Sequence, residues 1–146
     1  MDKTDKLTAI KLAIECSKYV HNLRGDWNEN KKNIIKETIS FIKLVYEHPA
    51  KFHVRFISNK AIIIYGPRIS PRDMYVYLLY VSPKEHGKHY GKQLLDYAIE
   101  NGKKFAALRL TVDKNNEKAI KFYKSNGFEI EKTVDDISYD MIYKKY

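Results

Sequence analysis

The strongest structural signal in this chain is the stretch MYVYLLYVSPKEHGKHYGKQLL, which runs from residue 74 to residue 95. Its first part, Met74 to Val81, is aromatic and β-branched, which is typical of a buried strand. A loop with two glycines, Gly87 and Gly91, leads into an amphipathic segment that is typical of a helix. The first N–H groups of a helix have no intrahelical partner and lie at the positive end of its dipole. The arrangement therefore predicts a loop that binds phosphate.

The spacing of this loop excludes two common nucleotide-binding motifs. A Walker A loop needs a glycine where His86 stands and a Ser or Thr where Gln93 stands. A dinucleotide fingerprint needs a second glycine where His89 stands. The phosphate ligand is therefore of another kind.

The loop instead resembles the acyl-CoA loop of the GNAT superfamily of N-acyltransferases, V-x-P-x-x-[RQ]-x-x-G-x-[GA]. Val81, Pro83 and Gly91 fit this pattern. His86 stands where Arg or Gln is usual, and His89 stands where the middle glycine is usual. A histidine at that place is strained if the loop requires a positive φ.

A second block, at the distance that the family requires, supports the resemblance. From Val112 to Phe128 the chain is similar to the family's second signature, V-x-x-x-N-x-x-A-I-x-x-Y-x-x-x-G-F, and meets every named position. These positions include Asn116, Tyr123 and Gly127. The resemblance covers about half of the chain, from Met74 to Lys144, and an accidental βαβ unit with ordinary helix caps is the competing explanation.

The resemblance implies an α/β (α+β) fold in one N-acetyltransferase domain, residues 1–146. We expect a mixed, mostly antiparallel sheet with two central parallel strands that splay apart, flanked by about four helices. Hydrophobic periodicity and turn residues predict the elements. The helices are expected at 7–23, 28–46, 90–101 and 116–126, with a single turn at Pro83, and the strands at 52–57, 61–65, 74–81, 105–112, 128–132 and 137–144. No strand is expected before the first helix.

Local signals set the expected ends and faces of these elements. Asn28 is the expected cap of the second helix, and 66–68 and 70–73 are expected to be loop. The first helix is expected to bury a stripe that includes Leu7 and Leu23 and that leaves Cys16 to one side. A lone thiol without an adjacent base is more often a packing residue than a nucleophile.

The resemblance also implies a coenzyme site. The pantetheine arm of acetyl-CoA would add along the strand that ends at Val81, and the N–H groups from about His86 to Lys92 would bind its pyrophosphate. The residues expected at this site are Tyr80, Val81, His86, Gly87, Lys88, His89, Tyr90, Gly91, Lys92, Asn116 and Tyr123. Asn116 is equally well explained as a helix cap.

Acyl transfer to an amine needs a neutral amine and a protonated leaving thiol. Tyr123 stands at the family's catalytic tyrosine position and is the expected acid, unless its ring only packs the short helix. No base is evident, because Met74 to Tyr80 contains no carboxylate. The candidates for a proton relay through water are Tyr75, Tyr77, Tyr80 and Asp73.

Composition limits the other possibilities. The chain has 146 residues, one cysteine and a net charge of +9, with no apolar run long enough to span a membrane. These features favour a cytoplasmic protein without disulfides or a membrane partner. No cluster has metal-ligand spacing, so no metal is expected. The positive charge is spread along the chain, which argues against a nucleic-acid partner, and a homodimer is left open.

Two functions follow. The first is an N-acetyltransferase that moves an acetyl group from acetyl-CoA to a primary amine of a small molecule or protein, by direct attack in a ternary complex. The second is a non-catalytic basic module that binds acyl-CoA or nucleic acid. The positive charge also predicts an acceptor whose amine lies beside an anionic or neutral polar group, because a polycation would be repelled.

Overall fold

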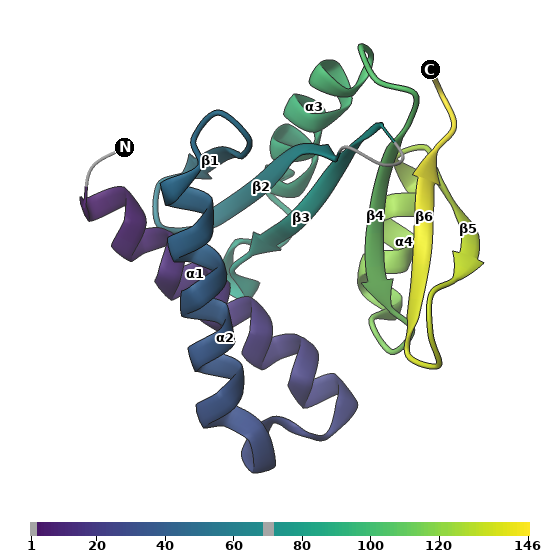
Figure 1. Cartoon of the computed structure of the whole chain (residues 1–146). Coiled ribbons are helices and arrows are strands. Elements are labelled where there is room, and N and C mark those ends of the chain that lie inside the picture. The colour runs from purple at the N-terminus through teal and green to yellow at the C-terminus, as the bar shows by residue number, and fades with distance from the viewer. Residues whose placement is uncertain (1–2, 69–71) are drawn as a thin grey trace.

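The computed structural model describes residues 3–68 and 72–146. Four α-helices, a 3₁₀ turn and six strands follow one another in these ranges (Figure 1). The helices are α1 (Lys3–Arg24), α2 (Trp27–Glu47), α3 (Tyr90–Gly102) and α4 (Glu117–Ser125), and the turn is η1 (Pro83–Glu85). The strands are β1 (His53–Ile57), β2 (Ala61–Arg68), β3 (Asp73–Val81), β4 (Leu108–Asp113), β5 (Phe128–Thr133) and β6 (Ser138–Tyr143).

The strands form one mixed sheet in the order β1-β2-β3-β4-β6-β5. Only β3 and β4 pair in parallel, as expected for two strands joined through a helix, and every other pairing is antiparallel. The expected mixed, mostly antiparallel sheet with four helices is therefore confirmed, and no strand precedes α1 within the described residues.

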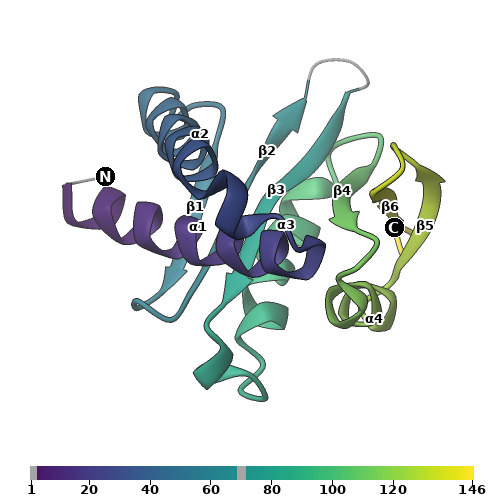
Figure 2. The same cartoon turned by 90° about the horizontal axis from the view of Figure 1, so that it is seen from below.

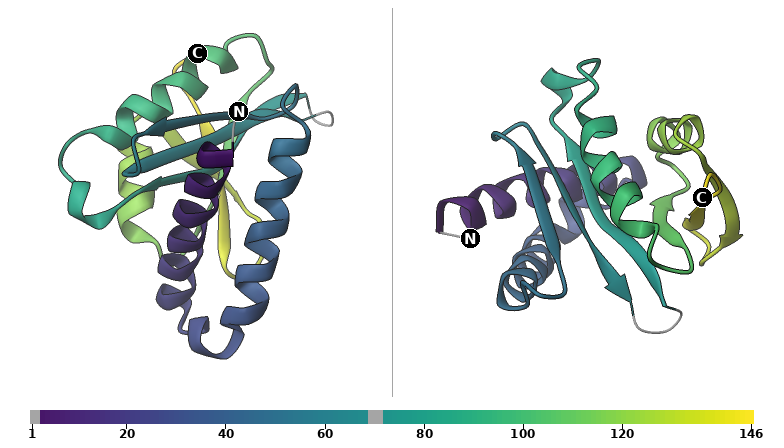
Figure 3. Two further views of the ribbon diagram at one scale, coloured as in Figure 1. Left: turned by 90° about the vertical axis from the view of Figure 1, so that its left-hand side faces the viewer. Right: turned by 90° about the horizontal axis from the view of Figure 1, so that it is seen from above.

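The sheet carries a hydrophobic core on each face. Successive residues of a strand point to opposite faces, so Ile63 packs with α3 and α4 while Ile62 and Ile64 pack with α1 and α2. Figure 3 shows the two pairs of helices on opposite sides of the sheet. In Figure 1, α1 and α2 lie in front of β1 to β3, whereas β4, β6 and β5 have no helix of the described chain in front of them.

The two central strands separate like a fork. β3 and β4 pair only through Met74–Leu108, Tyr75–Arg109 and Val76–Leu110. At the same level β3 has an extra residue, Tyr77, because Tyr65 of β2 pairs with Val76 and Ile64 pairs with Leu78. Such a bulge bends the strand that carries it, so β3 turns away from β4 just beyond the last shared pair. Figure 2 shows the resulting gap between β3 with α3 and β4 with α4.

The buried face of α1 differs from the predicted stripe. Leu7 is 66% exposed and Leu23 is 38% exposed, whereas Ala9, Leu12 and Ala13 are buried. The packed face therefore centres on the fully buried Leu12 together with the two alanines, and it excludes the two ends of the predicted stripe. Cys16 lies one helical turn beyond Leu12 on the same face and is half-buried.

Other boundaries also depart from expectation. The cap position of α2 is Asp26 and not Asn28, and the Asp26 carboxylate binds His21 at 2.8 Å in place of a helix N–H group. β2 continues through Gly66 to Arg68, where a loop was expected, because it pairs with the start of β3. A Cβ on Gly66 would lie 2.2 Å from the Lys51 carbonyl oxygen, so only glycine allows this strand to pass. The expected loop at Ser70 and Pro71 lies outside the described residues.

Candidate active site

A pocket of about 550 Å³ lies in the fork between β3 and β4. Its walls are the end of β3, the loop and first turn of α3, the inner face of α4, and Cys16, Tyr19 and Val20 of α1. Every residue that sequence predicted at the coenzyme site lines this pocket except Lys88. Lys88 forms an exposed ion pair with Glu85, at 2.6 Å, instead.

The loop before α3 has a backbone shape that exposes the helix N-terminus. Gly87 has a φ of 90° and His89 a φ of 63°, the left-handed region. A non-glycine residue in that region is strained by roughly 1–2 kcal/mol, so the strain expected for a histidine at this place is present. The first residues of α3, Tyr90, Gly91 and Lys92, line the pocket, and the N–H groups of a first helical turn have no intrahelical partner. η1 forms as the expected single turn, although the Ser82 side chain does not cap it.

His86 connects this loop to both walls of the pocket. Its Nε2 lies 3.0 Å from the carbonyl oxygen of Val81, and its Nδ1 lies 2.7 Å from Nζ of Lys118. A carbonyl accepts and an ammonium donates, so the ring carries its proton on Nε2 and accepts at Nδ1. The bridge places a lysine at the pocket that sequence reasoning missed. The sequence did carry a signal for this lysine, because Lys118 lies in the first turn of α4, two residues after Asn116.

Asn116 performs the capping role and also lines the pocket. Its side-chain oxygen accepts a hydrogen bond from the N–H of Ala119 at 3.2 Å, at the start of α4. The side chain is thereby fixed at the wall of the fork. The two interpretations of Asn116 are compatible.

Tyr123 is buried in the same pocket, with 8% of its surface exposed. Its ring packs edge-on against Phe122 and Phe128, with centroid distances of 5.4 and 5.7 Å. Among the described residues nothing forms a hydrogen bond with its hydroxyl. Burial raises the pKa of this hydroxyl, so it stays protonated at neutral pH.

Burial also raises the pKa values of two neighbouring side chains in the pocket wall. It raises the pKa of the Cys16 thiol to about 12, so Cys16 is not a thiolate nucleophile at neutral pH. The pKa of Tyr80 is raised to about 12, again mainly by burial. Both side chains are neutral donors at the pocket wall, and the sequence did not predict the contribution of α1.

The other candidates for a proton relay lie away from this pocket. Asp73 is fully buried at the start of β3 and is held by Arg68 at 2.5 Å and by Arg109 at 3.0 Å. An aspartate with two arginine partners does not fit a proton relay. Tyr75 donates to the hydroxyl of Thr111 at 2.6 Å, and burial raises the pKa of both Tyr75 and Tyr77.

Two further properties bear on the site. No group of three or more His, Cys, Asp or Glu side chains within 3–68 and 72–146 is placed to hold a metal ion. In the same ranges no helix is both long and apolar enough to cross a membrane.

Residues 22–128 match the model of the acetyltransferase (GNAT) family. This match covers most of the chain, so the protein belongs to the GNAT family and is an enzyme of the acetyltransferase class. No curated protein sequence matches this chain significantly.

Solved structures share the fold. The PaiA N-acetyltransferase from Thermoplasma acidophilum, in complex with coenzyme A, has a TM-score of 0.72 and 23% identity, over 99% of this chain and 95% of that one. The protein PH1933 from Pyrococcus horikoshii OT3 has a TM-score of 0.75 and 19% identity, over 100% and 94%. A GNAT-family protein from Desulfovibrio desulfuricans, described as a putative acetyltransferase, has a TM-score of 0.67 and 15% identity, over 97% and 92%.

Proposed function

We propose that this enzyme transfers the acetyl group of acetyl-CoA to a primary amine of a small molecule or protein, by direct attack in a ternary complex. The observation that carries the proposal is the fork pocket, which combines an open strand edge, a helix N-terminus and Tyr123, a buried residue whose hydroxyl has no hydrogen-bond partner among the described residues.

The residues of the pocket fit the parts of the coenzyme. Beyond Val76, β3 has no partner on the β4 side, so its backbone groups near Tyr80, apart from the Val81 carbonyl that accepts from His86, are available to the amides of a pantetheine arm. The N–H groups at the start of α3 suit the pyrophosphate. Lys118, which His86 holds at the pocket, supplies a hydrogen-bond donor and positive charge beside it. The PaiA N-acetyltransferase from Thermoplasma acidophilum, which shares the fold, was solved in complex with coenzyme A, and this supports coenzyme A as the ligand.

In the proposed transfer the acetyl group passes directly from the sulfur of the coenzyme to the nitrogen of the acceptor. The neutral amine forms a C–N bond with the thioester carbonyl carbon, the C–S bond breaks, and the leaving thiolate takes a proton from the Tyr123 hydroxyl. The amine gives up its own proton to water, which also returns a proton to Tyr123. The raised pKa of Tyr123 keeps the acid loaded, and the neutral Cys16 thiol argues against an acetylated cysteine.

The test is release of coenzyme A from acetyl-CoA in the presence of a panel of primary amines. Initial rates measured over both substrates should give intersecting lines, and the mass of the enzyme should show no acetyl adduct after incubation with acetyl-CoA alone. Parallel lines with an acetylated enzyme would contradict direct attack. Binding of acetyl-CoA without release for any amine would favour the non-catalytic module.

A further inference from the structure

Three aspartates are buried among residues 3–68 and 72–146, and one of them has neither a hydrogen bond nor an ion pair within these ranges. Asp73 is held by Arg68 and Arg109. Asp113 is held by Arg24 and by the N–H of Asn115. Asp140 is 7% exposed, and no described residue gives it a hydrogen bond or an ion pair. Burial raises its pKa, which means that the ionised carboxylate is disfavoured where it stands.

Asp140 lies at the apex of the fork. It pairs with Thr111 across β6 and β4, so the two side chains share one face of the sheet. The Thr111 hydroxyl accepts from Tyr75 of β3 at 2.6 Å, just beyond the last β3–β4 pair at Val76 and Leu110. Asp140, Thr111 and Tyr75 therefore form a polar row across three strands where β3 and β4 begin to separate.

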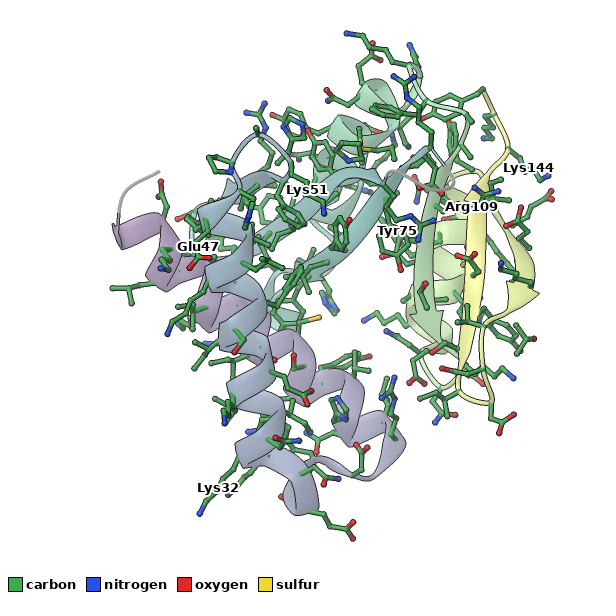
Figure 4. All side chains as sticks on the ribbon, in the orientation of Figure 1. Lys32, Glu47, Lys51, Tyr75, Arg109 and Lys144 are labelled. Carbon is green, nitrogen blue, oxygen red and sulfur yellow. The ribbon has the colours of Figure 1, made fainter. Side chains whose placement is uncertain are left out.

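The row faces away from α3 and α4. The alternate residues of β4 and β6, Leu110 and Met141, are buried in the core on the α3 and α4 side. Figure 4 shows Tyr75 and Arg109 next to each other at this junction, in front of the strands that no helix covers. A molecule can thus reach the apex from the face opposite to α3 and α4.

Positive groups surround Asp140 without touching it. Arg68 stacks over the Tyr75 ring at 4.1 Å and interacts electrostatically with Asp140, yet the two form no ion pair. Lys132 pairs with Asp140 across β6 and β5, and it too forms no ion pair with it. Arg109 is already engaged by Asp73 and Glu131. A buried anion and a partly exposed guanidinium therefore face the same space.

We propose that Asp140 binds the amino group of the acceptor and that Arg68 binds an anionic group of the same molecule, so the acceptor is an amino acid or a related zwitterion. An ammonium group would give Asp140 the hydrogen bonds that it lacks, and a carboxylate would use the N–H groups of Arg68 that Asp73 leaves free. Tyr75 and Tyr77, whose rings lie 4.9 Å apart, would contact the rest of the acceptor.

The same arrangement disfavours two other ligand classes. A polyamine would place further positive charge beside Arg68, Arg109 and Lys132, which repel it. A simple monoamine would satisfy Asp140 and leave Arg68 without an anion. Between Met74 and Tyr80, β3 contains no carboxylate that could contact the amine. In this arrangement Asp140 of β6 provides one.

This inference rests on the proposed acetyl transfer, so its test includes a measurement that needs no turnover. The probes are the common α-amino acids and, for the best of them, its amide, its decarboxylated amine and spermidine. Their binding to the enzyme saturated with coenzyme A is followed by saturation-transfer NMR, and their kcat/KM with acetyl-CoA is measured separately. The variants are Asp140→Asn and Arg68→Gln, with Asp136→Asn as the control. Asp136 is an exposed aspartate of the same hairpin, so its substitution removes the same charge.

The wild type should prefer the amino acid over its decarboxylated amine by at least about tenfold in kcat/KM, which corresponds to about 1.4 kcal/mol. Asp140→Asn should raise the KM for every amine about tenfold or more and leave the KM for acetyl-CoA unchanged. Arg68→Gln should weaken only the probes that carry a carboxylate. Asp136→Asn should behave like the wild type.

Several outcomes overturn the inference. They are equal amine KM values for Asp140→Asn and Asp136→Asn, a preference for spermidine or the decarboxylated amine, and an absence of NMR binding by every amino acid. Binding that depends on Asp140 without any release of coenzyme A would instead support the site and refute the proposed transfer.

Discussion

Lys118 of α4 and His86 of the loop before α3 meet at 2.7 Å across the fork pocket, and the same imidazole donates to the Val81 carbonyl at 3.0 Å. The contact joins the two sides of the fork at the level of the α3 N-terminus. A pyrophosphate that binds there would offer the Lys118 ammonium group an anionic partner in place of the His86 ring. The histidine found where the family pattern has Arg or Gln thus has a lysine beside it.

Loss of Lys118 should weaken acetyl-CoA binding. We expect Lys118→Met to raise the Kd for acetyl-CoA about tenfold at low salt, because a charge-assisted hydrogen bond contributes roughly 1.5–3 kcal/mol. The measurement is titration calorimetry at low and high salt. Lys32→Met is the control, because Lys32 lies far away on α2 (Figure 4) and the change removes the same charge. Equal affinities for the two variants would exclude Lys118 from the phosphate site.

Acetyl-CoA should stabilise the fold, and a larger residue at Gly91 should prevent it. A ligand at about a hundred times its Kd adds roughly 2.7 kcal/mol to the free energy of unfolding. A Cβ on Gly91 would lie 3.2 Å from the Phe122 ring and 3.7 Å from Val81, so Gly91→Val pushes the start of α3 away from both walls of the pocket. Thermal unfolding with and without acetyl-CoA measures this. An intact shift in a folded Gly91→Val variant would place the phosphate site elsewhere.

The Tyr123 hydroxyl should act in the chemical step and not in binding. Tyr123→Phe keeps the ring contacts with Phe122 and Phe128, so the fold and the KM for acetyl-CoA should change little. If the hydroxyl is the acid, kcat should fall about a hundredfold. Because burial raises its pKa, the wild type should show no loss of rate from Tyr123 ionisation near pH 10, the ordinary tyrosine pKa. An unchanged kcat in the variant would assign Tyr123 to packing.

The sequence predicts most of what lies between residues 74 and 128, for a local reason. The strand, loop and helix at this place each carry their own signal, and the order in which they join makes β3 and β4 parallel. The residues that line the fork pocket are therefore mostly close together in sequence. Tyr123 and Asn116 can also be predicted, because the second family motif lies at a fixed distance from the first.

What the sequence misses depends on contacts between distant segments. The packed face of α1, with Ala9, Leu12 and Ala13, is set by its contacts with α2 and the sheet, so the contribution of Cys16 to the pocket was not predicted. Asp140 is visible only as a charged residue inside an otherwise apolar strand. Its place at the fork follows from β6 lying between β4 and β5, which no local pattern sets.

Asp140 should also destabilise the fold in a manner that depends on pH. Burial raises its pKa above the ordinary aspartate value of 3.8, so the folded state holds the proton more tightly than the unfolded state does. The penalty is absent below the unfolded pKa, grows as the pH rises through the folded pKa, and is complete above it. Asp140→Asn should therefore raise the free energy of unfolding at about pH 7, and this gain should shrink toward about pH 4.

Urea unfolding of the wild type, Asp140→Asn and Asp136→Asn across this pH range measures the effect. Asp136→Asn changes the same charge at an exposed position of the hairpin, so it should shift stability little at either end. If the Asp140 carboxylate does not stabilise the fold, its place at the apex of the fork is explained by binding of the acceptor. If Asp140→Asn instead lowers stability at neutral pH, the carboxylate has a structural partner in solution, and its assignment to the acceptor loses its main support.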